Sequence, residues 1–375
     1  MKRIWGLSIF ILANFFMNSG YAGPFKLSRT GINPLLPTVV KDTLNTFFDE
    51  AETNVNSNLP NADASTYLNG MSDAAILTTK GLGTDYASNM DLFVIGGGVG
   101  AGLDLPGTGF SDVFSGKVNS QNFRGIGLQT SFMAGLQLGV FHFPVFWEYF
   151  DLNKMSVYLN AMSLDLPKFK EGFSGKLSNF GFHLQYKVMQ PISFGTFLFS
   201  WGGVDFTTGF ETSTLTIKYA RTDTITQSSV VAVPVAGLGT VNDTVNTNIT
   251  ANSQVGANVS STTIPLEIST NIRFLYLFSL FGGLAMDINS GSSSALAAVN
   301  TNLTVTDTRS ILTGANAVTS SGSLDLGQSG KPTGSNFRWF SGLQLNLTIV
   351  KLYLQLNKAV SQDTLGFGAG VRIAW

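Results

Sequence analysis

Apolar residues alternate with small or charged ones over the last eleven positions of the chain, 365–375. A repeat of two predicts a β-strand, because successive side chains of a strand point to opposite faces. One face is wholly apolar, and the other carries glycine, alanine and Arg372. An apolar face that ends in an aromatic residue, Trp375, is typical of the closing strand of a barrel in lipid. The edge strand of a soluble sheet is the alternative that this stretch leaves open.

The same alternation recurs earlier in the chain and predicts ten strands in all, at 91–103, 125–140, 143–166, 177–188, 193–206, 263–274, 277–288, 337–349, 352–358 and 365–375. A tilted strand needs roughly 9–11 residues to cross a bilayer, which is about the length of each run. Tight turns and longer links follow one another along the chain. The turns lie near 141–144, 190–192, 274–277 and 350–351, and the links at 104–124, 167–176, 209–262 and 289–336. We therefore predict an all-β fold, a transmembrane antiparallel β-barrel of about ten strands over residues 89–375.

The composition supports a membrane barrel over a soluble β-sandwich. Charged residues make up 12% of the chain, about half the usual share in a soluble protein. A sandwich would expose faces of glycine and glutamine to water with few charges on them. The net charge of −1 and the lack of a basic block argue against nucleic acid as a partner. Because the chain has no cysteine, disulfides, thiolate catalysis and a cysteine-linked lipid anchor are excluded.

The first 88 residues differ from the alternating part. Lys2 and Arg3, an apolar run and small residues up to Ala22 predict a secretory signal peptide at 1–22, with an uncleaved anchor helix as the alternative. Apolar residues at helical spacing then predict helices at 36–57 and about 63–77. The segment 23–88 is therefore expected to be helical. It forms either a periplasmic cap or a plug that enters the barrel.

Several charged residues fall on the predicted inward faces of the strands. They are Lys187, Glu267, Arg273, Arg338 and Arg372, to which Asp91 and Asp287 are added. The first interpretation is a network of ion pairs that keeps a narrow barrel shut. The second is a selectivity ring that would favour anions in an open pore. A ten-strand barrel is much smaller than the open porins, which argues against a wide aqueous pore.

No catalytic arrangement emerges from the sequence. The glycines at 96–102 precede a loop rather than a helix, so they lack the context of a phosphate-binding loop. His142 and His183 lie in different segments, without a carboxylate at metal-ligand spacing. We therefore expect neither an enzyme nor a cofactor or metal site.

The long links 209–262 and 289–336 are the candidate binding regions, because external loops on a rigid barrel commonly carry function. Alternation at 212–221 predicts that a hairpin extends above the membrane. At the other end of the chain, four residues resemble the C-terminal signal that the barrel-assembly machinery reads: Phe367, Val371, Ile373 and Trp375. Aromatic residues near strand ends predict interfacial belts in the lipid bilayer of the outer membrane, namely Trp147, Tyr149, Tyr276, Trp339 and Trp375.

The run from Lys80 to Met90, which leads into the glycine-rich first strand, resembles a family of leptospiral surface adhesins. The stretches Asn58-Leu59-Pro60-Asn61 and Tyr67-Leu68-Asn69-Gly70 are similar as well. The resemblance implies a surface-exposed protein of a spirochaete outer membrane that binds laminin or other host matrix proteins. It implies no catalytic residues. A narrow channel or small-solute transporter is the alternative function, and a structural protein without a ligand is the third.

Overall fold

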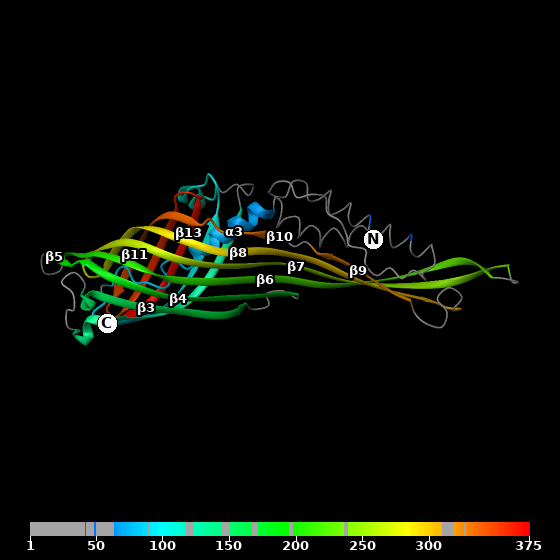
Figure 1. Cartoon of the computed structure of the whole chain (residues 1–375), viewed down its shortest axis with the longest axis horizontal. Helices are drawn as coiled ribbons and strands as arrows, with labels where there is room; N and C mark the ends of the chain where they lie inside the picture. Colours follow the sequence, from blue (N-terminus) through cyan, green and yellow to red (C-terminus); the bar gives the residue numbers. More distant parts are fainter. Residues whose placement is uncertain are drawn as a thin grey trace.

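The computed structural model of the chain describes residues 64–88, 90–117, 124–143, 151–166, 172–194, 198–235, 239–309, 318–325 and 328–375, together with Asp42 and Asp49. Within this part, ten antiparallel strands pair side by side and close into a ring (Figure 1). Successive ring strands are neighbours, and the last strand pairs with the first. A closed ring satisfies the backbone groups of every strand at membrane depth, which lipid requires.

Seven of the ring strands hold 10–17 residues: β1 (Phe93–Asp104), β2 (Gly125–Gln137), β3 (Met155–Leu166), β4 (Phe173–Met189), β11 (Ser335–Leu347), β12 (Val350–Ala359) and β13 (Thr364–Ala374). The other three hold 37, 36 and 30 residues: β6 (Phe199–Val235), β7 (Gly239–Phe274) and β8 (Phe278–Asp307). Three short strands are added to β6 or β8: β5 (Ile192–Phe194), β9 (Val318–Asp325) and β10 (Gln328–Gly330).

The C-terminal strand closes the ring. β13 pairs with β1 from Val94 opposite Ala374 to Asp104 opposite Thr364. The last residue also joins this pairing. The Trp375 amide donates to the Phe93 carbonyl at 2.9 Å, and the Trp375 carbonyl accepts from the amides of Leu92 and Phe93. The alternating C-terminal stretch is therefore the seam of the barrel.

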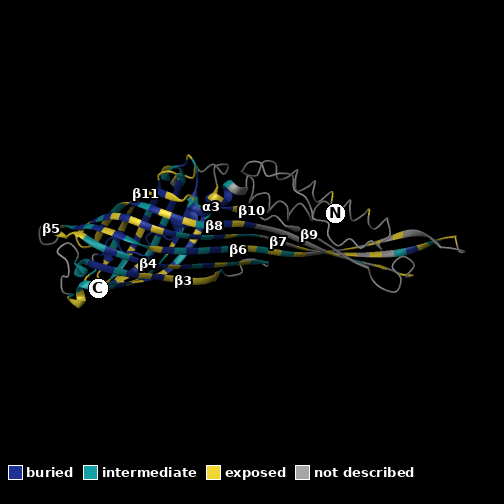
Figure 2. Ribbon diagram, viewed as in Figure 1, coloured by how far each residue is buried: buried dark blue, intermediate teal, exposed yellow. Residues whose placement is uncertain are grey.

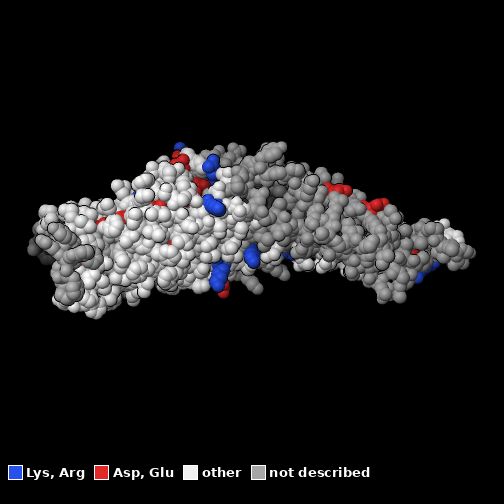
Figure 3. Space-filling view, viewed as in Figure 1, with Lys and Arg blue, Asp and Glu red and all other residues white. Residues whose placement is uncertain are grey.

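Buried and exposed positions alternate along the ring strands (Figure 2), and the exposed positions hold large apolar residues whereas many buried ones are polar. Leu284, Phe132 and Leu354 are 60–70% exposed, whereas the neighbouring inward positions are buried. An apolar surface that runs round a whole protein is stable only against lipid. On the face in Figure 3, the barrel is almost free of charged side chains. The fold is thus an antiparallel transmembrane β-barrel, as the alternation predicts.

Helical structure is limited in the described residues. The predicted helix at 63–77 is confirmed as α3 (Ala64–Thr78), and a short helix, α4 (Phe110–Phe114), lies in the link after β1. None of the described helices is long and apolar enough to cross a membrane. The predicted signal peptide lies outside the described residues, as does the helix at 36–57 except for Asp42 and Asp49, which are both helical.

The prediction of loops at 209–262 and 289–336 is wrong for most of these residues, which form strands instead. β6, β7 and β8 continue as one sheet, with β6 and β7 in register from Glu211 opposite Thr263 to Val235 opposite Gly239. Runs of threonine, valine and isoleucine suit an extended sheet better than a loop when neighbouring strands supply hydrogen bonds. The sheet leaves the barrel at the end opposite the C-terminus (Figure 1). We call residues 221–235, 239–253, 299–307 and 318–325 the projecting sheet.

The predicted tight turn at 141–144 and the start of the next strand at 143 are also wrong. β2 ends at Gln137, and a 3₁₀ turn, η2 (Leu138–Phe141), follows. β3 starts only at Met155, after a second 3₁₀ turn, η3 (Leu152–Lys154). The Asp151 carboxylate accepts the Asn153 amide at 2.9 Å, which favours a turn over a strand there. Trp147 and Tyr149 lie outside the described residues.

Candidate functional site: a charged plug and a projecting sheet

Residues 64–88 lie inside the ring, and we call them the plug. Leu68, Ala74 and Leu77 of α3 are at most 1% exposed. The helix packs against β1, β2 and β13 on one side of the lumen and against β7 and β8 on another. Of the two positions that the sequence leaves open for this segment, the described residues therefore occupy the lumen rather than a cap outside it.

The glycine face of the first strand makes room for the plug. A β-carbon at Gly100 would overlap the carbonyl oxygen of Thr78, and one at Gly102 would overlap that of Ala74. The backbone of α3 and the tail after it thus approach the wall without intervening side chains. This close approach gives the repeated glycines of β1 a structural reason.

Lys80 lies at the centre of the first charge cluster. Its Nζ atom is 2.5 Å from Glu211 Oε2 on β6 and 3.6 Å from Asp287 Oδ1 on β8. The Thr79 hydroxyl donates to the same Glu211 oxygen at 2.9 Å. All these side chains are buried. A buried ammonium is stable only when carboxylates surround it, so the cluster fixes the end of α3 to two strands.

Arg338 on β11 connects the remaining acids of the cluster. Its guanidinium donates to Asp287 at 2.9 Å, to Glu267 at 2.5 Å and to the Asn357 side chain at 2.9 Å. Tyr86 of the plug donates its hydroxyl to Glu267 at 2.6 Å. Through Lys80, Tyr86 and Arg338, this cluster therefore links the plug to five strands, β6, β7, β8, β11 and β12.

A second cluster forms around Arg372 on β13. Its guanidinium donates to Asp85 at 3.2 Å and to the carbonyl oxygens of Gly81 and Thr84 at 2.8 and 2.7 Å. It also lies 3.7 Å from the ring centre of Tyr353. The seam strand thus binds the tail of the plug through one fully buried arginine.

The predicted inward charges reach different partners. Arg338, Arg372 and Glu267 lie in the two clusters described above. Arg273 donates to the Ser88 carbonyl at 2.8 Å, and Lys187 pairs with Asp205 at 2.8 Å. Because acidic residues balance these basic groups, the predicted basic excess that would favour anions is not present. Asp287 is buried in the network, whereas Asp91 is exposed before β1 begins, so its inward placement is wrong.

Sequence reasoning missed three members of the clusters. Lys80 and Asp85 lie in the N-terminal segment, whose position was open, and Glu211 lies in a stretch expected to be loop. A signal was nevertheless present, because Lys80 and Asp85 are the only charged residues from 74 to 90. In a membrane barrel, isolated charges in an otherwise neutral segment call for buried partners.

The histidines form no metal site among the described residues. His183 is buried with Nε2 3.4 Å from Glu211 Oε1, whereas His142 lies in an exposed turn with a left-handed backbone. Near the outer rim, Asp73 of α3 accepts hydrogen bonds from the amide and hydroxyl of Thr333 at 2.7 and 3.1 Å. Burial raises the pKa of Asp73 above its usual value, and these two hydrogen bonds oppose the rise.

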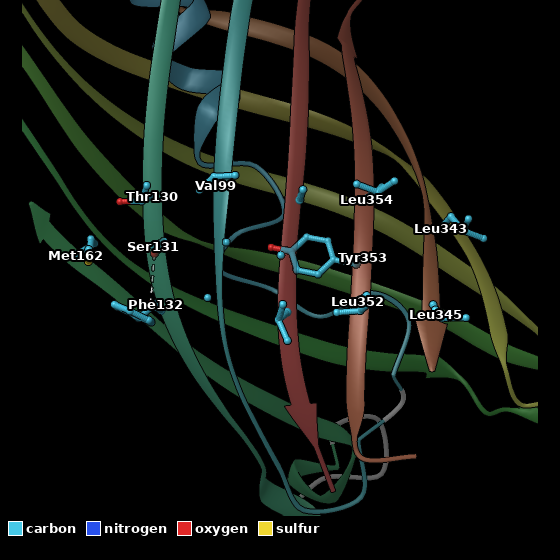
Figure 4. Close-up of a pocket in the computed structure, with 15 residues that line it drawn as sticks. Val99, Thr130, Ser131, Phe132, Met162, Leu343, Leu345, Leu352, Tyr353 and Leu354 are labelled. Atoms are coloured by element: carbon cyan, nitrogen blue, oxygen red, sulfur yellow. Dashed lines mark hydrogen bonds between the residues drawn. The ribbon is translucent and has the colours of Figure 1, made fainter. Parts of the chain in front are cut away.

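The predicted assembly residues lie on the outer face of the seam. Val371, Ile373 and Trp375 are 39–64% exposed, and Phe367 is half-buried beside Phe110 of α4. A shallow hollow of about 740 Å³ lies in the wall here, lined by Val99, Phe132, Leu354 and other mostly apolar neighbours (Figure 4). Its apolar lining suits lipid chains, so it is part of the membrane surface of the barrel.

The projecting sheet has the opposite character. The described side chains on one of its faces are mostly threonine, serine and asparagine, as at Thr222, Thr224 and Thr226 on β6 and Asn248 and Asn252 on β7, with Val230 exposed among them. Cross-strand hydrogen bonds join some of them, such as Thr222 to Asn252 at 2.7 Å and Ser228 to Asn246 at 2.6 Å. This exposed, uncharged surface is the second candidate site.

Solved structures with the same general architecture are only distantly similar. The β domain of the Bordetella autotransporter BrkA is 9% identical with a TM-score of 0.23, over 76% of this chain and 100% of that one. A Pseudomonas aeruginosa FadL homologue is 8% identical with a TM-score of 0.23, over 82% and 98%. The translocator domain of NalP from Neisseria meningitidis is 12% identical with a TM-score of 0.21, over 80% and 93%. At this level of similarity, nothing about their activities transfers to this chain.

Sequence comparison gives a sharper result. No curated protein matches the sequence. One family model does match, and it covers almost the whole chain, from the N-terminal segment through the plug and the barrel to the last residue. Residues 28–375 match the model described as Lsa36-like, and the chain therefore belongs to the Lsa36-like family.

Proposed function

We propose that this outer-membrane protein is a surface-exposed adhesin that binds host extracellular-matrix proteins, laminin among them, through the projecting sheet. The observation that carries the proposal is the length of β6, β7 and β8, which run far beyond the seven shorter ring strands. A barrel needs only about 9–11 residues per strand to cross the bilayer. The surplus residues build a platform held away from the membrane by a rigid base, an arrangement suited to binding large partners.

The filled lumen supports the same proposal. The plug is held to the barrel wall by two buried ion pairs, Lys80 with Glu211 and Asp85 with Arg372. Breaking a buried pair costs about 3–5 kcal/mol. A narrow channel or small-solute transporter, the alternative function, would require the plug to move and these pairs to separate. If the purified protein conducts no ions in planar bilayers, the result agrees with adhesion. Conductance that Arg372→Ala alters would favour the channel.

The decisive experiment removes the projecting sheet and leaves the barrel intact. Residues 221–253 and 299–324 are each replaced by a two-residue Asn-Gly turn, because Ala220 is opposite Gln254 and Ala298 is opposite Asp325. Glu211 and the plug contacts remain. We expect normal insertion, measured by heat-modifiable mobility on gels, and at least about tenfold weaker binding to immobilised laminin or other matrix proteins. Unchanged binding to all matrix proteins that the full-length chain binds would contradict the proposal.

Surface exposure is tested on intact cells. Protease should cut within the projecting sheet and leave residues 64–88 uncut, because the barrel wall encloses them. Cuts in the plug on intact cells, or an uncut projecting sheet, would contradict the proposed orientation.

A further inference from the structure

We propose that the free edge of β6 receives an extended polypeptide segment of the matrix partner as an additional strand. The inference rests on the proposed function and names how the partner is recognised. Strand addition of this kind uses main-chain hydrogen bonds for affinity, and it needs a long sheet edge whose donors and acceptors are unpaired.

One edge of β6 loses its partner partway along the strand. β4 pairs with β6 from Met189 to Phe173, which is opposite Tyr219, and the pairing ends with the Ala220 amide donating to the Gly172 carbonyl at 2.8 Å. Beyond Ala220, β6 continues to Val235 and pairs only with β7 among the strands of the described chain. On this side of residues 222–235, no strand of the described chain pairs with β6.

The hydrogen bond of Ala220 shows which residues face the open edge. In a strand, the amide and carbonyl of alternate residues point to the same side. Since the Ala220 amide points toward β4, the backbone groups of 222, 224, 226, 228, 230 and 232 point to the open edge. Those of 223, 225, 227 and so on point to β7, in an unbroken register. The next position on the open side is Pro234, which has no amide to offer, as is common in edge strands.

At the opposite margin of the same sheet, the edge strand is β9 rather than β8. β8 pairs with β11, then with β10 at Ser293–Ala295, and then with β9 from Ala298 to Val305. Natural proteins cover, shorten or charge exposed edges to prevent unwanted pairing. Here the edge strand β9 holds only 8 residues and ends at the charged Asp325, whereas β6 offers a longer edge whose residues 225–235 contain no charged residue. This difference in length and charge between the two edges favours a binding role for the edge of β6.

The chemistry of the edge defines the partner. An uncharged segment with β-branched and hydroxyl-bearing residues pairs best with a strand of the same character. A segment from a separate molecule can approach antiparallel to β6, which is slightly the more stable arrangement. Two copies of this chain in one membrane would point their β6 strands in the same direction and could pair only in parallel. The partner is therefore a flexible or edge segment of a matrix protein rather than a second copy.

The test uses proline, which removes one amide donor without changing the charge. In the full-length protein, the double variant Thr224→Pro, Thr226→Pro deletes two donors on the open edge and keeps the amides that face β7. The matched variant Thr224→Val, Thr226→Val keeps every amide and removes the two hydroxyls. Each lost hydrogen bond should weaken binding by about 2–12-fold. We therefore expect the proline variant, which loses two, to bind immobilised laminin about tenfold more weakly. The valine variant should bind within about twofold of the unmodified protein.

Hydrogen–deuterium exchange on the unmodified protein gives a second readout that does not depend on the folding of a variant. The amides of 222, 224, 226 and 228 should exchange rapidly in the free protein and become protected when laminin is added. The amides of 223, 225 and 227 should be slow in both states. Protection of the even-numbered amides in the free protein would overturn the inference.

The outcomes separate this inference from the proposed function. If removal of the projecting sheet abolishes binding but the proline variant binds normally, the adhesin remains and the added strand is refuted. If the valine variant loses as much binding as the proline variant, the partner reads side chains, and the added strand is again refuted. Self-association that the proline variant abolishes, with matrix binding unchanged, would assign the edge to a second copy. If removal of the sheet has no effect, the proposed function itself fails.

Discussion

Strands β6, β7 and β8 build two regions of opposite character. Inside the ring, their outward residues are large and apolar, such as Ile268 at 58% exposure, and their inward residues include the buried Glu211, Glu267 and Asp287. In the projecting sheet the same strands carry threonine, serine and asparagine on an exposed face. The antiparallel ladder runs through both regions, with a register shift between Trp201 and Val204 in the ring and an unbroken register in the projecting sheet. The difference shows that the type of side chain along a strand follows its surroundings: apolar against lipid, charged against the plug and polar against water.

The two regions also differ in how they resist change. In the ring, the charged groups of the two clusters are buried and have partners on another strand or on the plug, so one substitution leaves a charge unpaired. In the projecting sheet, side-chain hydrogen bonds such as Thr222 to Asn252 are open to water, which replaces a lost partner. Substitutions should therefore destabilise the protein in the first region and alter binding in the second.

The largest expected effect is that of Arg338→Ala. The change leaves Glu267 and Asp287 buried without their main partner, so the barrel should lose about 3–5 kcal/mol of unfolding free energy. Urea-induced unfolding in detergent, followed by tryptophan fluorescence, measures this loss. Thr226→Val in the projecting sheet is the matched control and should change stability by less than about 0.5 kcal/mol. Equal losses in the two variants would remove the distinction between the regions.

Deletion of Trp375 should have the second largest effect. It removes three backbone hydrogen bonds to residues 92 and 93 at the seam, each contributing about 0.5–1.5 kcal/mol. It also removes the aromatic end of the stretch that we expect the barrel-assembly machinery to bind, so the amount of protein in the membrane should fall severalfold. Trp375→Ala keeps the backbone bonds. A fall with the deletion but none with Trp375→Ala would show that the seam matters and the aromatic ring does not.

Gly100→Ala tests the close packing of the plug. The added β-carbon would overlap the Thr78 carbonyl, so the end of α3 must shift, at a cost of about 1–3 kcal/mol. The control is Gly368→Ala, also on an inward face, where the nearest atom would lie at 3.6 Å, an ordinary contact. Thermal unfolding followed by circular dichroism compares the two. If Gly368→Ala destabilises the barrel as much, close approach of the plug is not the reason for the glycines.

The smallest effect concerns Asp363, in the turn between β12 and β13. The Gly107 amide and then the Lys358 side chain hydrogen-bond to its carboxylate and lower its pKa. A carboxyl group whose pKa is lower in the folded protein than in the unfolded chain stabilises the folded state. This stabilisation is fully present above the pKa of the unfolded chain, about 4, and is lost as the pH falls through the pKa of the folded protein. Asp363→Asn should therefore lower the thermal midpoint slightly at pH 7 and leave it unchanged well below pH 3. A larger difference in acid than at neutral pH would contradict this assignment.

The alternating pattern predicted the barrel wall well because a strand in lipid allows few exceptions. At β11 the sequence places Trp339 and Leu343 opposite Arg338 and Gln344, and the structure exposes the first two and buries the others. The wall of β3 was predicted less well, since turn residues such as Asp151 compete with strand formation over a short stretch. The projecting sheet was missed as a sheet because threonine and asparagine runs suit both loops and paired strands, and only a neighbour in register decides between them.

The sequence by itself determined the period of the strands, their closing seam and several of the charges that face inward, among them Glu267, Arg338 and Arg372, because lipid excludes charge from the outer wall. It left open the partner of each charge. Only the tertiary structure decided that Lys80 reaches Glu211 across 131 positions and that Arg372 reaches Asp85 across 287. It alone decided that α3 lies within the lumen and that, among the described strands, only β7 pairs with the outer part of β6. Such pairings depend on how a ring closes around a plug, which a local repeat of two residues does not encode.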